Sequence, residues 1–78
     1  MEYKKHLLNK FVRSKRKSLK MTQKEMSEKA GVGLRFVREL ERGKRTLKMD
    51  KVDQVLFLFG YELGPIESIR DNNRNEEG

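Results

Sequence analysis

The chain has no cysteine and no tryptophan, and it contains one histidine and one proline in 78 residues. Without cysteine, neither a disulfide nor a thiolate zinc site can brace the fold. The lone histidine, His6, has no cluster of carboxylates to complete a metal site, and we interpret it as an exposed side chain. The glycines form no P-loop or dinucleotide-binding pattern. The sequence therefore favours a protein that is not an enzyme and needs neither metal nor cofactor.

Long apolar runs are also missing. No segment approaches the roughly 18 apolar residues of a membrane span, and the N-terminus lacks the apolar core of a signal peptide. A chain of this length forms at most one domain with a small core. We therefore expect a single soluble cytoplasmic domain with no membrane partner.

Acidic residues are absent from a long N-terminal block. The chain carries 19 lysines and arginines against 12 acids, a net charge of +7, and residues 4–24 contain nine of these bases and no acid. A block of one sign in a foldable segment indicates a polyanionic partner such as nucleic acid. The alternative is a solvated helix face that only keeps the protein soluble.

Apolar spacing predicts helices over 3–19, 23–30, 34–42 and 50–59. On the first helix, the inward positions are expected to be Leu8, Phe11, Val12 and Leu19. Thr22 and Glu25 form a capping-box pattern before the second helix, and Gly31 is a natural stop for it. Gly33 precedes the third helix as its N-cap.

The third predicted helix has two kinds of face. Val37 and Leu40 point into the core, which leaves Leu34, Arg35, Arg38, Glu39 and Arg42 outside.

After the fourth helix, Pro65 permits either a short edge strand over residues 61–66 or a short helix over 66–69. We expect one domain over residues 1–69 and a disordered tail over 70–78, which has no apolar residue.

Residues across this arrangement resemble the Xre/Cro helix-turn-helix family of bacterial and phage repressors. The positions that carry the resemblance are Met21-Thr22-Gln23, Met26-Ser27, Ala30-Gly31-Val32, Val37, Leu40-Glu41 and Gly43, within residues 8–60. The resemblance implies an all-α, lambda-repressor-like DNA-binding bundle of four to five helices. It also implies a double-stranded DNA operator as partner and a bacterial or phage protein associated with the nucleoid.

The resemblance assigns roles to individual positions. Gln23 matches the glutamine with which the family contacts phosphate, and Gly33, Leu34, Arg35 and Arg38 occupy base-reading positions. Arginines there either bind guanine in bidentate fashion or contact phosphate only. Leu34 stands where relatives often carry glutamine, and its apolar side chain suits a thymine methyl group. Further phosphate contacts are expected from Lys24, Arg42, Lys44 and Arg45.

Two further expectations concern packing and assembly. The resemblance implies a structural salt bridge between Arg16 and Glu41, and it implies binding as a two-fold homodimer. Ser27 departs from the family's alanine, and its hydroxyl is expected to bond to its own helix. An apolar patch is predicted as the dimer interface, with a larger monomer core as the alternative. The patch comprises Phe57, Leu58, Tyr61 and Leu63.

The link into the fourth helix narrows the resemblance further. The run Leu47-Lys48-Met49-Asp50-Lys51 is similar to that of HipB-type antitoxins of toxin–antitoxin modules, which repress their own operon and bind a HipA-like kinase toxin. A phage-type regulator and a restriction–modification controller are alternatives. A protein-interaction module that has the fold but no DNA binding is a third.

Overall fold

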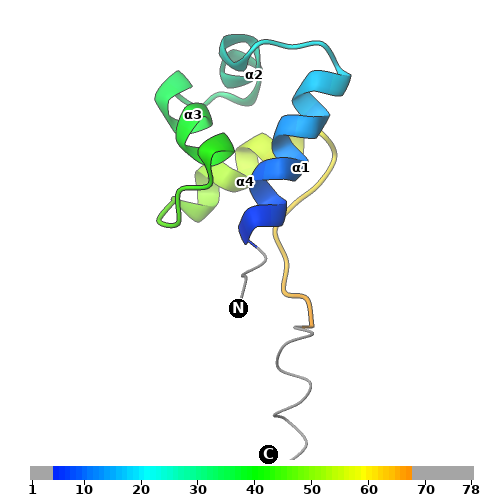
Figure 1. Ribbon diagram of the computed structural model, residues 1–78, viewed down its shortest axis with the longest axis vertical. Coiled ribbons are helices and arrows are strands. Elements are labelled where there is room, and N and C mark those ends of the chain that lie inside the picture. Colours follow the sequence, from blue (N-terminus) through cyan, green and yellow to red (C-terminus); the bar gives the residue numbers. More distant parts are fainter. Residues whose placement is uncertain (1–4, 68–78) are drawn as a thin grey trace, which may run out of the picture.

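The computed structural model describes residues 5–67, and within this range the chain forms four α-helices and no strand. The helices are α1 (Lys5–Ser18), α2 (Gln23–Ala30), α3 (Leu34–Arg42) and α4 (Met49–Leu58). Figure 1 shows α2 above the other helices and the segment after α4 returning beside α1. The prediction of an all-α bundle is confirmed.

The predicted boundaries of α2 and α3 are confirmed, and α4 begins and ends one residue earlier than expected. The predicted start of the first helix at residue 3, the side chain of His6, residues 68–69 and the predicted tail over 70–78 lie outside the described residues.

One apolar cluster holds the helices together, because each of them contributes residues spaced three or four apart. Its buried members are Val12, Met26, Val32, Val37, Leu40, Val52, Val55 and Leu56. The inward assignment of Leu19 is wrong: its side chain is 58% exposed, because α1 ends at Ser18 and the chain then turns away. Phe36, which was not among the predicted inward positions, packs against the cluster.

Both ends of α2 are fixed by local chemistry. Thr22 Oγ1 accepts the Glu25 amide at 3.0 Å, and the Glu25 carboxylate accepts the Thr22 amide at 2.8 Å, which completes the predicted capping box. The helix ends at Gly31, whose φ of 78° lies in the left-handed region that favours glycine. The Gln54 amide of α4 donates to the carbonyl oxygens of Ala30 and Gly31. These contacts set the path of the chain from α2 into α3.

Ser27 is the small residue on the face of α2 that packs toward α3, and its hydroxyl makes the predicted hydrogen bond. Ser27 is buried, and its hydroxyl donates to the Lys24 carbonyl of its own helix at 2.7 Å. The hydroxyl is therefore satisfied without interrupting the apolar packing around it.

Residues 61–67 form an irregular segment, so the first of the two alternatives, an edge strand over 61–66, is wrong. The Leu63 amide, which a strand would use for pairing, donates to Asp53 Oδ1 of α4 at 2.7 Å. The Tyr61 ring meets the Phe11 ring of α1 edge-on, with centroids 4.8 Å apart. The ammonium of Lys15 lies 5.4 Å from the Tyr61 centroid. The segment is therefore bound to both α1 and α4.

Candidate nucleic-acid interface

Helix α3 presents arginines on the face opposite its core contacts. Val37 and Leu40 are buried, and the 100° step of an α-helix turns Arg35, Arg38 and Arg42 to the other side. The Arg35 side chain is 91% exposed. Leu34 is half-buried rather than fully outside, because it lies at the edge of the buried face.

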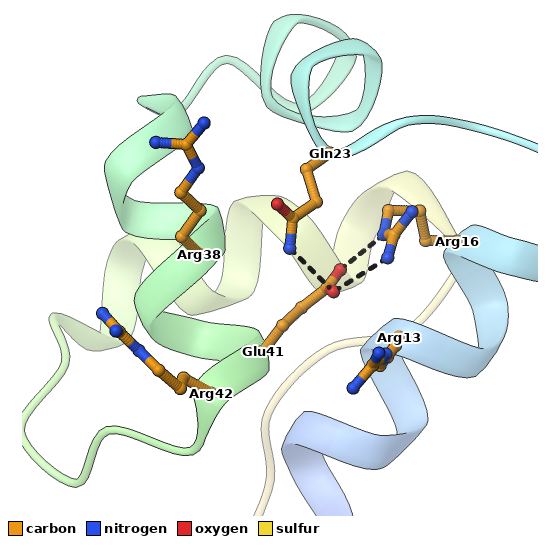
Figure 2. A pocket seen from close by; sticks show the side chains of 6 residues that line it. All are labelled: Arg13, Arg16, Gln23, Arg38, Glu41 and Arg42. Carbon is orange, nitrogen blue, oxygen red and sulfur yellow. Dashed lines mark hydrogen bonds and ion pairs between the residues drawn. The ribbon is translucent and has the colours of Figure 1, made fainter.

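A groove of about 320 Å³ runs along one side of α3, and we call it the α1–α3 groove. Its lining comes from three helices: Arg13 and Arg16 of α1, Gln23 of α2, and Arg38, Glu41 and Arg42 of α3. The lining thus contains four guanidinium groups and one carboxylate. Figure 2 shows Glu41 between Gln23 and Arg16, while Arg38 and Arg42 extend away from it.

Glu41 is the centre of a buried polar network in this groove. Its carboxylate accepts Arg16 Nε at 2.7 Å and Arg16 Nη2 at 3.0 Å, and the two side chains are only 4% and 12% exposed. Arg16 also donates to the Met21 carbonyl oxygen at 2.9 Å. The expected salt bridge between α1 and α3 is therefore present, and it neutralises Arg16.

Gln23 belongs to the same network, a contact that was not among the predictions. Its Nε2 donates to Glu41 Oε1 at 3.1 Å. This bond uses one of the two N–H groups of the amide and leaves the second for another acceptor. Gln23 is therefore held in one orientation at the groove.

The other three arginines of the α1–α3 groove keep their charge available. Among the described residues, Arg13, Arg38 and Arg42 form no ion pair or side-chain hydrogen bond. Guanidinium groups that line one groove and have no carboxylate partner suit phosphate oxygens. Arg13 is an addition to the predicted set. The signal was its position three residues before Arg16, which places both on one face of α1.

A second groove, of about 460 Å³, lies on the other side of α3, and we call it the α3–α4 groove. Phe36 and Leu47 contribute apolar lining. Its charged lining comprises Arg35, Glu39, Lys44, Lys48 and Lys51. Lys48 and Lys51 were not among the predicted contacts. Helix α3 thus stands between two cationic grooves, as a helix in the DNA major groove lies between two phosphate backbones.

Comparisons with known proteins agree with this geometry. Residues 12–66 match the family described as Helix-turn-helix. The chain belongs to this family. The chain is also 48% identical over 50 residues to a protein of Sinorhizobium fredii (strain NBRC 101917 / NGR234) named "Uncharacterized HTH-type transcriptional regulator y4mF". That match covers 64% of this chain and 66% of the relative, just under two thirds of its length. No solved structure gives a significant match.

Other predicted contacts of the helix-turn-helix domain lie outside the two grooves. Lys24 is exposed on α2, and Arg45 is exposed in the turn after α3.

In the described part of the chain, no group of histidines and acids could hold a metal ion. None of the described helices has the length and apolar character needed to cross a membrane.

The predicted dimer patch does not form one exposed surface. Phe57 is 75% exposed, but Leu58 is half-buried and packs against the core. Tyr61 is 46% exposed and contacts Phe11, and Leu63 is half-buried beside Asp53. Leu58, Tyr61 and Leu63 therefore make contacts within the monomer, and the dimer interface stays a prediction.

Proposed function

We propose that this protein is a sequence-specific, double-stranded DNA-binding transcriptional regulator. The observation that carries the proposal is the position of α3 between two cationic grooves, with Arg35, which lines the α3–α4 groove, 91% exposed. Membership of the helix-turn-helix family supports it, as does the name of the Sinorhizobium fredii relative.

In this proposal, α3 enters the major groove and reads bases through its N-terminal half. Arg35 and Arg38 contact guanine, and the exposed part of Leu34 contacts a thymine methyl group. Gly33 lets the backbone approach the bases, because it has no side chain. A Cβ there would meet no heavy atom within 4 Å, so packing within the described protein does not itself require glycine.

Phosphate contacts then fall on two sides. The α1–α3 groove receives one strand through Arg13, Gln23 and Arg42. The α3–α4 groove receives the other through Lys44, Lys48 and Lys51, with Lys24 and Arg45 as outer contacts. Such contacts fix the register of the protein on DNA but do not read its sequence.

The test begins with selection of bound duplexes from a randomised library, followed by fluorescence-anisotropy titration of the selected operator and a scrambled duplex. We expect one enriched motif and tighter binding of the operator. The seven cations assigned to phosphate give a slope of about −6 for log K against log salt concentration. Equal affinity for both duplexes overturns the proposal. Binding to neither favours a protein-interaction module of the same fold.

We also propose that the regulator binds its operator as a homodimer. Phe57 supports this, because it lies near the end of α4 and is 75% exposed. No other part of the described chain buries this large apolar side chain, which is typical of an interface residue. We expect Phe57→Ser to shift the protein to monomer in sedimentation equilibrium and to abolish protection of two half-sites about 34 Å apart. Leu19→Ser, at a 58% exposed position outside the proposed interface, is the control. An unchanged dimer in Phe57→Ser places the interface elsewhere.

A finer proposal is that the regulator is an autorepressing antitoxin with a HipA-like kinase as partner. It is supported by the link residues Leu47, Met49, Asp50 and Lys51. Co-expression with a kinase encoded beside its gene tests it: a stable complex and rescue of growth support it. If no gene beside its own encodes such a kinase, the antitoxin proposal is excluded, and a phage-type or restriction–modification regulator is the remaining hypothesis.

A further inference from the structure

Glu39 is an acid on the exposed side of a helix that otherwise presents cations. Its Oε2 lies 3.6 Å from Arg35 Nε, and its Oε1 lies 3.4 Å from Lys44 Nζ. The Glu39 side chain is 21% exposed, whereas Arg35 is 91% and Lys44 is 47% exposed. The carboxylate therefore lies at the base of the α3–α4 groove and the two cations project beyond it.

Stability does not account for this arrangement. An exposed pair four residues apart on a helix contributes little, because water and salt screen it and both side chains lose freedom. On a surface that meets DNA, a carboxylate also repels phosphate and so weakens binding to every duplex. Glu39 therefore stabilises the fold little and weakens DNA binding in general, so its position on this surface calls for another role.

The geometry of the Arg35 contact indicates that role. The carboxylate approaches Nε, on the inner edge of the guanidinium group. The two terminal nitrogens form the fork that binds O6 and N7 of guanine. Arg35 can therefore keep Glu39 as a partner while its fork contacts a base.

We infer that Glu39 is a specificity-determining residue that acts through Arg35. This inference rests on the proposed DNA-binding function. At the correct operator, Arg35 keeps its ion pair and gains two base contacts, so the carboxylate is neutralised. On any other duplex, Arg35 must leave Glu39 to reach a phosphate, and the carboxylate then faces the backbone unpaired. Glu39 thus weakens non-specific binding more than operator binding.

The test compares Glu39→Gln with the wild-type protein on the selected operator and on scrambled duplex. Glutamine keeps the shape of the side chain and removes its charge. We expect the affinity for scrambled duplex to rise about threefold to tenfold, while operator affinity changes less, so that the specificity ratio falls. Repeating the library selection should show relaxed preference at the base read by Arg35. Glu62→Gln makes the same charge change on the irregular segment, outside both grooves, and should leave the ratio unchanged.

A second pair of variants separates positioning from a general charge effect. In an Arg35→Ala background, Glu39→Gln should no longer change base preference, because the two residues act as a unit. If Glu39→Gln strengthens binding to operator and scrambled duplex by the same factor, the role of Glu39 is overturned. If the wild-type protein itself shows no sequence preference, the proposed function fails and this inference fails with it.

Discussion

Breaking the ion pair between Arg16 and Glu41 should strongly destabilise the domain. We expect Glu41→Leu and Arg16→Met each to lower the free energy of unfolding by about 3–5 kcal/mol. Each variant leaves a buried charge with only a neutral hydrogen-bond partner, the Met21 carbonyl oxygen for Arg16 or the Gln23 amide for Glu41. The double variant should be more stable than either single variant, because it removes both charges together.

The magnitude follows from the geometry of the pair. The two side chains are 4% and 12% exposed, and their closest atoms are 2.7 Å apart, so screening by water is small. A contact of this length at an effective dielectric constant near 20 corresponds to an attraction of about 4–6 kcal/mol before desolvation. A domain of this size has a total stability of only about 3–5 kcal/mol. Either single variant should therefore be largely unfolded at 37 °C.

Urea denaturation followed by circular dichroism at 222 nm measures the four proteins of this double-mutant cycle. The expected coupling energy is at least about 3 kcal/mol. Ser14→Ala, at an exposed position on α1, is the control and should change the free energy of unfolding by no more than about 0.5 kcal/mol. If the losses of the two single variants simply add in the double variant, the pair is not coupled and the reasoning is refuted.

Three smaller predictions concern the caps and the two kinds of DNA contact. Thr22→Ala should cost about 1 kcal/mol in the same denaturation assay, because it removes half of the capping box. Gly31→Ala should lower the free energy of unfolding by about 1–2 kcal/mol, because alanine is strained at the positive φ of this position. Gly31→Asn should lower it less, and equal losses would contradict the role of that conformation. In the anisotropy assay, Arg35→Ala should cost about 1–3 kcal/mol on the operator and relax one base position. Lys48→Ala should instead weaken all duplexes alike and reduce the salt slope by about one, and identical behaviour of the two would contradict this division.

The parts of the fold that sequence could predict are those that local chemistry defines. The boundaries of α2 follow from Thr22 and Glu25 at one end and Gly31 at the other, all within the helix or next to it. Leu19 shows the limit of this reasoning. Its spacing fits the inner face of α1, but the helix ends one residue earlier and the left-handed Lys20, with φ of 58°, turns the chain away.

The parts that sequence could not predict depend on long-range contacts. Gln23 and Glu41 are 18 residues apart, and their hydrogen bond exists only because α2 and α3 pack at one angle. Lys48 and Lys51 join Arg35 in one groove only because the chain folds back after α3. Leu63 is the same case, since its amide finds Asp53 ten residues away rather than a neighbouring strand.

The positions of two acids on α3, more than the net charge of +7, determine which cations the helix offers to DNA. Glu41 is buried and removes Arg16 from the available set, while Glu39 holds Arg35 and Lys44 in place at the surface. Five groove cations in the described chain have no carboxylate partner: Arg13, Arg38, Arg42, Lys48 and Lys51. Arg38 is assigned to guanine. The other four, with Lys44, which Glu39 only partly neutralises, and the outer cations Lys24 and Arg45, are the seven phosphate contacts behind a salt slope of about −6. A slope that counted every lysine and arginine of the chain would be far steeper, so the measured value distinguishes a defined interface from diffuse attraction between a basic protein and DNA.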